Sequence, residues 1–400
     1  MKLWVTIAGI ATLSAAASAQ DKDNKPKVDP AKVDAAIDNG CKFLKTQVDT
    51  ILGTPISMTW EPGSPGSKRH SMIPIAVLTL KHGGVAADDP AFKRLFDAML
   101  SMKIETTYTA ALMAMALQKI DPVKYQSRIA ECAQYLVDNQ AKNGQWCYGH
   151  ATDTSVPAPK EEIERPKGGG SRIATRGKDN KDEPKEEPKK INRYTLTRKS
   201  QSACAHGDNS NSQYAALGMR AATECNVVVP RETLTAALGY WERAQRPDGG
   251  WDYGVPANVN DQFSQRISYG SMTIGGFSSI AIYKVLLSGD YKGDTRVQGA
   301  GGWIAKNWSV DVNPANPKYY HYYFLYGVER GGDLVGNEKF GTHDWYFEGA
   351  TWLLAQQGAN GGWKGNLPSE EIETVATCFA VLFLKRATVP LIKTEGSARK

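Results

Sequence analysis

The segment Cys204-Ala-His206-Gly-Asp208 places three chemically active side chains at alternate positions. Zinc accepts a thiolate, an imidazole and a carboxylate as ligands, and Gly207 would allow the tight turn that brings them to one ion. The sequence itself requires no cofactor, and Cys204, His206 and Asp208 are the candidate ligands if zinc binds. The alternative is that Asp208 or Ser210 caps the helix that follows.

Four residues are candidates for proton transfer. His206 comes first because histidine titrates near neutral pH, and Asp208 is an acid close to it in the sequence. His321 and Glu329 follow, since a glutamate in an apolar helical pattern must find a partner or shift its pKa. We therefore take His206, Asp208, His321 and Glu329 as the candidate catalytic residues.

An internal repeat indicates the elements that position these residues. Gln140, Gln245 and Gln357 are each followed by a glycine four residues later and a tryptophan six residues later. Each copy ends a stretch with helical periodicity and leads, after a polar loop, into a more apolar helix. The glycine would stop the first helix, the glutamine would bond helix ends, and the indole would cover the helix pair. We predict a packing joint and not a catalytic loop.

Weaker copies of this unit extend over the rest of the chain, which gives six predicted helix pairs. An amphipathic helix alternates with a more apolar one, a pattern that favours an all-α fold, an (α/α)6 toroid, over an open solenoid. The predicted pairs are 33–47 with 72–81, 92–102 with 108–118, 129–137 with 211–222, 234–241 with 272–287, 297–303 with 319–328, and 345–354 with 375–386.

The repeated Q-x-x-x-x-G-x-W element resembles that of the terpenoid cyclase and protein prenyltransferase superfamily, the squalene-cyclase type of toroid. The blocks 207–214 and 341–346 resemble those of exported bacterial toroids whose role is generally unassigned. The resemblance covers nearly all of the chain after residue 19 and implies the fold more than an activity. The acidic D-x-D-D cluster of the cyclases, the D-x-C zinc pair of the prenyltransferases and the C-G-E-Q thioester motif are all absent from the sequence.

In a closed toroid the N-terminal ends of the inner helices converge on one rim. We expect their unpaired N–H groups to suit an anion there. Tyr319, Tyr322, Tyr323 and Tyr326 would share one helix face, which could hold a cation, stack on a sugar or simply pack in the core. The predicted ligand-binding residues are Asn209, Asn211, Tyr214, Thr273, Tyr320, Tyr323 and Thr374.

The remaining organisation follows from composition. Residues 1–19 read as an export signal with an A-x-A cleavage site, so we expect a periplasmic or extracellular protein with one domain over residues 20–400. Residues 151–200 are charged and almost free of apolar side chains, which predicts a disordered insertion. Of the six cysteines, at most one or two disulfides are expected, and Cys41, Cys132 and Cys378 lie in apolar helical patterns.

Three functions remain open at this level. The first is a toroid of unassigned activity that binds an apolar or carbohydrate-like ligand, or an exported protein partner, in or around its centre. The second is a divergent isoprenoid cyclase or prenyltransferase. The third is a carbohydrate-active (α/α)6 enzyme, for which Glu373 and Asp208 would have to supply the paired carboxylates. The net charge of +6 is not gathered on a periodic face, so nucleic acid is not an expected partner. A membrane-spanning segment is not expected either.

Overall fold

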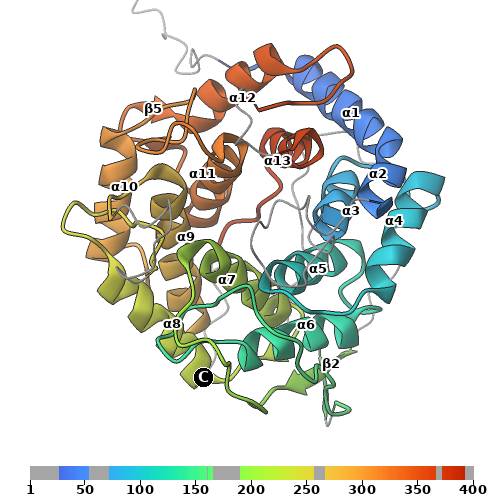
Figure 1. The fold of residues 1–400 in the computed structure, drawn as a ribbon, viewed down its shortest axis with the longest axis vertical. Coiled ribbons are helices and arrows are strands. Elements are labelled where there is room, and N and C mark those ends of the chain that lie inside the picture. Colours follow the sequence, from blue (N-terminus) through green and yellow to red (C-terminus); the bar gives the residue numbers. More distant parts are fainter. Residues whose placement is uncertain are drawn as a thin grey trace, which may run out of the picture.

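The computed structural model describes residues 27–53, 72–159, 161–164, 190–255, 266–365 and 372–391. An inner ring of helices is surrounded by an outer ring, as Figure 1 shows in a view along the ring axis. The inner helices are α3 (Met72–His82), α5 (Thr107–Ile120), α7 (Asn209–Glu224), α9 (Gly270–Leu286), α11 (His321–Val335) and α13 (Glu373–Lys385). The outer helices are α1 (Pro30–Thr46), α4 (Pro90–Ser101), α6 (Gln126–Asp138), α8 (Arg231–Ala244), α10 (Thr295–Lys306) and α12 (Trp345–Gln356), and a short α2 (Val48–Gly53) follows α1.

Contacts between the first and last helices close the ring. Each inner helix packs on the next, α13 packs on α3, and α1 packs on both α12 and α13. The outer helices bury one apolar face, as in α4, where Phe92, Leu95 and Met99 are buried at helical spacing. The inner helices are buried almost all round because the ring and the outer layer cover both sides. The predicted (α/α)6 toroid is thus confirmed, and the open solenoid is excluded.

The glutamine of each repeat links two successive outer helices. Gln245 Nε2 donates one hydrogen bond to Gly249 O in its own turn (2.8 Å) and another to Arg296 O in the first turn of α10 (2.9 Å). The other two copies repeat both bonds, from Gln140 to Gly144 O and Thr233 O, and from Gln357 to Gly361 O and Ala36 O. Because Ala36 lies in α1, the last copy joins the end of the ring to its beginning.

The tryptophan of each repeat links the outer helix to the inner helix of its pair. The Trp251 indole N–H donates to Trp241 O in α8 (3.1 Å), and its backbone N–H donates to Thr273 Oγ1 in α9 (3.2 Å). The same two bonds join Trp146 to Leu136 O and Ser212 Oγ, and Trp363 to Leu353 O and Thr377 Oγ1. Thr273, a predicted ligand-binding residue, is therefore buried within a packing joint instead. The structural role predicted for the repeat is confirmed.

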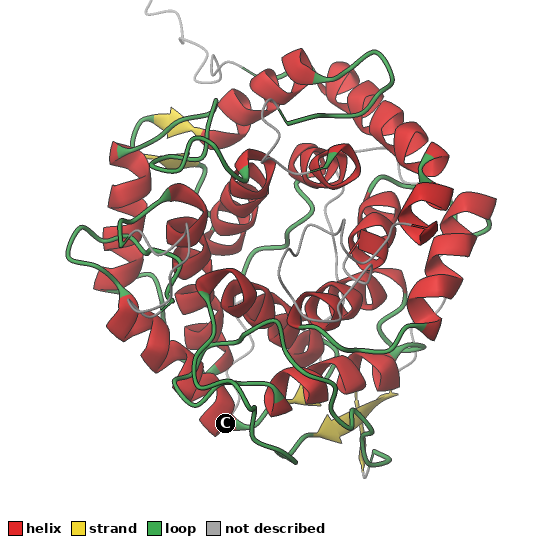
Figure 2. Cartoon of the chain, in the orientation of Figure 1, coloured by secondary structure: helices red, strands yellow, loops and turns green. Residues whose placement is uncertain are grey.

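The interpretation of 151–200 as a disordered insertion is wrong at both ends. Strand β1 (Glu161–Glu164) pairs antiparallel with β2 (Lys190–Thr195), which pairs in parallel with β3 (Val227–Val228) after α7. Nearer the ring, Lys199 Nζ bonds the Asp153 carboxylate (2.9 Å), and the Lys199 backbone N–H donates to Asp138 Oδ1 in α6 (2.7 Å). These strands lie on the outside of the toroid in Figure 2. Residues 160 and 165–189 lie outside the described part of the chain.

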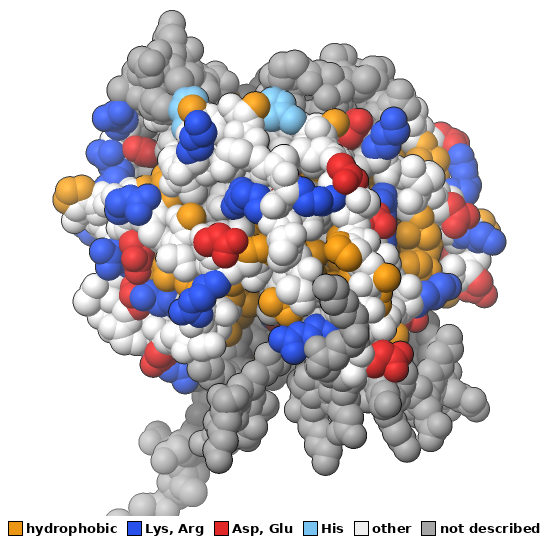
Figure 3. Space-filling model, turned by 90° about the horizontal axis from the view of Figure 1, so that it is seen from below, with side chains coloured by type: hydrophobic (Ala, Val, Ile, Leu, Met, Phe, Trp, Pro, Cys, Tyr) orange, Lys and Arg blue, Asp and Glu red, His pale blue; other side chains and the backbone are white. Residues whose placement is uncertain are grey.

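Beyond the ring there is only a second small ribbon, β4 (Lys339–Phe340) with β5 (His343–Asp344), within the described residues. Asp344 then caps α12 by accepting the Phe347 N–H (3.0 Å). On the face drawn in Figure 3, basic and acidic side chains alternate over short distances with apolar ones between them. No helix in the described ranges is both long enough and apolar enough to cross a bilayer.

Candidate functional site

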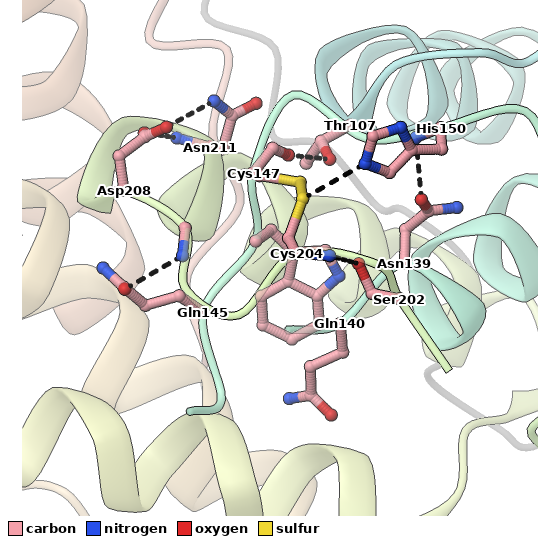
Figure 4. The surroundings of a disulfide bond; sticks show 12 residues. Thr107, Asn139, Gln140, Gln145, Cys147, His150, Ser202, Cys204, Asp208 and Asn211 are labelled. Atoms are coloured by element: carbon pink, nitrogen blue, oxygen red, sulfur yellow. Dashed lines mark hydrogen bonds between the residues drawn. A yellow bond between two sulfur atoms is a disulfide. The ribbon is translucent and has the colours of Figure 1, made fainter. Parts of the chain in front are cut away.

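The structure does not support a zinc site formed by Cys204, His206 and Asp208. Cys204 forms a disulfide with Cys147 (Figure 4), so its sulfur is not a free thiolate. Asp208 is buried at the start of α7, where its Oδ1 accepts the backbone N–H of Asn211 (2.8 Å) and its Oδ2 the Asn211 amide (2.9 Å). His206 is exposed. The alternative interpretation of Asp208, a helix cap, is confirmed.

His321 lies on the outer side of α11 and not at the ring axis. Its Nε2 donates to Val310 O (2.9 Å), and its ring packs edge-on against Trp352 of α12 with centroids 4.6 Å apart. Burial lowers the pKa of His321 to about 4. The imidazole is therefore neutral at physiological pH and has a packing role between α11 and α12.

Glu329 anchors the segment that follows α13. Its Oε1 accepts the Thr388 backbone N–H (2.8 Å), and its Oε2 is hydrogen bonded to the Thr388 hydroxyl (2.9 Å). The side chain is fully buried, and burial raises its pKa to about 8, with a further contribution from Asp333. Asp333 is itself paired with Arg386. Glu329 thus holds residues 386–391 against α11.

The elevated pKa of Glu329 predicts a pH dependence of stability. The folded protein retains this proton up to about pH 8, whereas the unfolded chain releases it near its ordinary value of 4.5. Between these values the folded state binds more protons, so the free energy of unfolding falls as pH rises, by up to about 1.4 kcal/mol per pH unit. Glu329→Gln can keep both contacts with Thr388 but cannot titrate, so it removes this pH dependence of the free energy of unfolding. We expect Glu329→Gln to gain stability relative to the parent chain from pH 5 to pH 8 in urea titrations.

Glu232→Gln is the matched control, because Glu232 is an exposed side chain in the first turn of α8. Its unfolding free energy should keep the pH profile of the parent protein. Identical profiles for Glu329→Gln and the parent would contradict the assignment of the buried proton to Glu329.

The first N–H groups of three inner helices are already occupied. Each is bonded to a carbonyl oxygen in the loop before the next inner helix: Thr107 N to Tyr148 O (2.9 Å), Asn209 N to Tyr253 O (2.8 Å) and Gly270 N to Pro314 O (2.8 Å). The expectation that free helix N-termini form an anion site is therefore wrong for α5, α7 and α9. A bond from each helix to the following repeat stabilises the ring at these positions instead.

The tyrosine run at the start of α11 divides between two environments. Tyr320 adopts a left-handed backbone (φ 58°), so the helix begins at His321 and Tyr319 lies outside it. Tyr322 points to the outer layer, where its ring is 5.8 Å from that of Trp352. Tyr323 faces the ring interior, and its ring lies 6.0 Å from that of Tyr214 in α7. The single tyrosine face predicted from the sequence is wrong, because two of its members belong elsewhere.

A buried arginine occupies the interior of the ring among these tyrosines. The Arg330 guanidinium lies over the rings of Tyr326 (4.3 Å) and Tyr214 (4.9 Å). It donates to Tyr214 Oη (3.1 Å) and to Gln213 Oε1 (3.2 Å). Among the described residues no carboxylate forms an ion pair with Arg330. The cation that an aromatic face can hold is supplied here by the protein itself.

A chain of hydrogen bonds leads from this cation to the N-terminal rim. An arginine side chain can only donate hydrogen bonds, so Gln213 must present its side-chain oxygen to Arg330. The side-chain nitrogen of Gln213 then donates to Tyr323 Oη (2.5 Å). Tyr323 and Ser210 are hydrogen bonded (2.9 Å), and Ser210 is hydrogen bonded to Tyr108 at the start of α5. With every donor oriented away from the cation, the chain runs from Gln213 through Tyr323 and Ser210 to Tyr108, and Tyr108 is also hydrogen bonded to Tyr323.

Further tyrosines surround the outer end of this chain. Tyr148 and Tyr253 are half-buried and hydrogen bonded to each other, and Tyr269 precedes α9. The Tyr148 ring lies 6.3 Å from that of Tyr108. Burial raises the pKa of Tyr108, Tyr253 and Tyr269, and the nearby Asp208 carboxylate raises it further. We call Tyr108, Tyr148, Tyr253, Tyr269 and Tyr323 the rim tyrosines.

The other predicted ligand-binding residues have these positions. Asn209 is buried and bonded on both sides, to the Tyr240 hydroxyl (2.8 Å) and to Asp252 O (2.8 Å). Asn211 is buried beside the Asp208 cap. Thr374 is buried in the first turn of α13, and Tyr320 is half-buried at the rim. Of the predicted set, only Tyr214 and Tyr323 join the arginine network.

Sequence reasoning missed Arg330, Gln213 and the rim tyrosines Tyr148, Tyr253 and Tyr269. Two signals point to them. The first signal is an arginine in an apolar helix, which needs partners as much as the adjacent Glu329 does. Tyr326 lies four residues before Arg330, on the same face of the helix, and is such a partner. Tyr148 and Tyr253 each follow a repeat tryptophan by two residues.

A polar pocket of about 470 Å³ lies apart from this network. It is lined by residues 100–105, from the end of α4 to the loop before α5, by Arg128, and by Ala151, Thr152 and Thr154. The Arg128 guanidinium beside it is bonded to Glu131 (2.5 Å). The pocket contains no candidate acid or base predicted from the sequence.

No family model and no curated protein matches the chain. Among solved structures, a possible member of the GH105 family from Salmonella enterica aligns with a TM-score of 0.51 at 9% identity, over 91% of this chain and 96% of that one. The type II terpene cyclase MstE from Scytonema aligns with a TM-score of 0.48 at 11% identity, over 89% and 99%. At 9% identity, the first of these alignments supports a common fold only. The chain is therefore an (α/α)6 toroid, the fold that its resemblance to the terpenoid cyclase and protein prenyltransferase superfamily implied.

Proposed function

We propose that the protein binds a small carbohydrate-like ligand with an acidic group at the rim tyrosines. The observation that carries this proposal is the buried Arg330 cation, which forms no ion pair with a carboxylate in the described part of the chain. A buried charge is costly unless it is compensated, and tyrosine rings compensate it only in part. An anionic ligand against the rim tyrosines would complete the compensation.

The polar groups of the network favour a sugar acid over an apolar acid. Tyr108, Ser210 and Tyr323 present hydroxyl groups, and tyrosine rings offer faces on which a sugar can stack. A sugar brings both hydroxyl groups and an apolar ring face, and so matches this combination of hydroxyls and aromatic faces better than a purely apolar ligand does. The Asp208 carboxylate lies near the rim tyrosines and would repel an anionic ligand. This repulsion is weakened because two Asn211 donors and the N-terminus of α7 offset the negative charge.

The isoprenoid cyclase alternative conflicts with the charge at the centre. A carbocation about 6 Å from a fixed guanidinium would be repelled by about 3 kcal/mol at an effective dielectric constant of about 20. A cation–π contact returns about 0.5–2 kcal/mol, and Arg330 already occupies the faces of Tyr214 and Tyr326. The repulsion exceeds the gain, so this interior disfavours carbocation chemistry.

The carbohydrate-active enzyme alternative needs two carboxylates that can act on one bond. The two acids predicted for this role are engaged elsewhere: Asp208 caps α7, and Glu373 accepts a bond from Asn360 (2.8 Å). We therefore propose ligand binding and not hydrolysis. Export, also part of the proposal, is supported by the Cys147–Cys204 disulfide, since such bonds persist in oxidising compartments.

Calorimetric titration of the full-length protein tests this function with three probes. These are a uronic-acid disaccharide, the corresponding neutral disaccharide, and farnesyl diphosphate, which carries its anion on an apolar chain. We expect the acidic sugar to bind at least about tenfold more tightly than either of the others, because a hydrogen bond to a charged group is worth about 1.5–3 kcal/mol. Equal binding of the two sugars would refute the role of Arg330. Preference for farnesyl diphosphate would support the isoprenoid alternative.

A further inference from the structure

The geometry points to a soft-metal site that forms when the Cys147–Cys204 disulfide is reduced. The two sulfur atoms and a ring nitrogen of His150 all lie within 4.8 Å of one another, and His150 Nε2 is 3.4 Å from Cys204 Sγ. Figure 4 shows the imidazole directed at the disulfide. We propose that Cys147, His150 and Cys204 together bind one zinc ion, or a cation of similar softness, in the reduced protein. Two thiolates and an imidazole are a ligand set that zinc prefers.

The positions of these residues are fixed by bonds that do not depend on the disulfide. Thr107 Oγ1, at the start of α5, donates to Cys147 O (2.7 Å). The His150 backbone N–H donates to Asn139 Oδ1 (2.9 Å) at the end of α6. Cys147 also follows directly on a repeat tryptophan that is bonded to two helices. The backbone on this side of the site should therefore keep its place after the S–S bond breaks.

Exposure makes this the reactive cysteine pair of the chain. Cys147 and Cys204 are half-buried and His150 is exposed, whereas Cys41, Cys132, Cys225 and Cys378 are buried free thiols. Burial raises the pKa of Cys41, Cys132 and Cys378 to about 12, so they remain protonated and compete poorly for a metal. These three buried cysteines are also the ones that the sequence predicted to be packed in helices.

Reduction of the Cys147–Cys204 disulfide needs a dithiol reductant, which supplies two electrons and two protons. One thiolate of the reductant attacks a disulfide sulfur and displaces the other protein thiolate, and its second thiol then releases the protein from the mixed disulfide. The products are two protein thiols and the oxidised, cyclic reductant. Metal binding displaces the two thiol protons. Three protein ligands leave a fourth position for water or a ligand, and Tyr148, between Cys147 and His150, is a rim tyrosine.

Cobalt titration of the full chain tests the proposal, because thiolate-bound Co²⁺ has a charge-transfer absorption that other ligands do not give. The protein is titrated in its oxidised form, and again after treatment with dithiothreitol and anaerobic desalting. We expect no thiolate band before reduction and one equivalent of bound Co²⁺ after it. In the reduced protein, His150→Ala should weaken binding at least about tenfold. His206→Ala, an exposed histidine two residues after Cys204, is the matched control and should bind as the parent does.

Three results would overturn the site. They are a reduced parent protein that binds no Co²⁺, an undiminished affinity in His150→Ala, and a thiolate band that survives in the Cys147→Ser/Cys204→Ser double variant. The last result would assign the band to the buried cysteines. His150→Ala leaves the disulfide intact, so its binding can be judged even if the double variant does not fold.

Discussion

Gly249→Ala should destabilise the protein by about 3 kcal/mol or more. Gly249 has a left-handed backbone (φ 89°), which costs a residue with a side chain about 1–2 kcal/mol. A Cβ there would also lie 2.6 Å from the carbonyl oxygen of Gly299 in α10. That oxygen belongs to a helix backbone, so relief requires the whole outer helix to move, with an overpacking cost of about 1–3 kcal/mol.

Urea unfolding of Gly249→Ala against Gly302→Ala measures this cost. Gly302 is exposed in the middle of α10, and a Cβ there meets nothing within 4 Å. Its replacement should raise stability by about 0.5–1 kcal/mol through helix propensity. Gly144 and Gly361 have the same left-handed backbone and the same approach to the next outer helix, at 2.3 Å and 2.6 Å, so their alanine variants should behave like Gly249→Ala. Equal stabilities for Gly249→Ala and Gly302→Ala would mean that the repeat turn is not the joint of the ring.

Arg330→Met should lower the affinity for an acidic sugar about a hundredfold while the protein remains folded. The substitution removes the positive charge and the donors to Gln213 and Tyr214 but keeps an apolar side chain of similar length. A hydrogen bond from a charged donor contributes up to about 3 kcal/mol to binding. Replacing a buried charge with an apolar group is often nearly neutral for stability. Calorimetry measures the affinity, and thermal melting confirms the fold.

Arg220→Met provides the matched control for this loss. Arg220 is also a largely buried arginine, but it lies near the C-terminal end of α7, where it bonds Glu224 and Val389 O. Its replacement removes the same charge away from the rim and should leave the affinity unchanged. Arg330→Lys retains a charge without the planar fork and should fall between the parent and Arg330→Met. If Arg220→Met lost as much affinity as Arg330→Met, the loss would come from the change in net charge and not from the position of Arg330.

The architecture could be predicted from the sequence because one local device is repeated. Three glutamine–glycine–tryptophan turns and the alternation of amphipathic with apolar helices are sufficient for six helix pairs, and the structure has all six. The predicted start of α11, residue 319, is two residues too early, because Tyr320 adopts a left-handed backbone. Tyrosine rarely adopts this conformation, and no pattern in the sequence predicts it. The boundaries of an element depend on such single dihedral angles, whereas its existence depends on the whole pattern.

The candidate site was less predictable because its members come from distant repeats. Tyr108, Ser210 and Tyr323 are brought together by ring closure, and none of their sequence separations signals a contact. The Cys147–Cys204 pair spans 57 residues across the charged insertion, and six cysteines allow many pairings. Asp208 had two interpretations at the start of α7, a ligand and a cap, and only the surrounding bonds distinguish them.

The central claim, that Arg330 acts on the ligand through the hydrogen-bond chain, is tested most directly by a double-mutant cycle with Tyr323→Phe. Tyr323→Phe interrupts the chain without a change in ring shape, and Tyr283→Phe, which removes a buried hydroxyl of α9 with no bond in the described structure, is its control. The quantity measured is the calorimetric affinity for the uronic-acid disaccharide in both backgrounds. We predict that Tyr323→Phe weakens binding about tenfold in the parent and by less than about twofold in Arg330→Met. The same loss in both backgrounds would contradict the account.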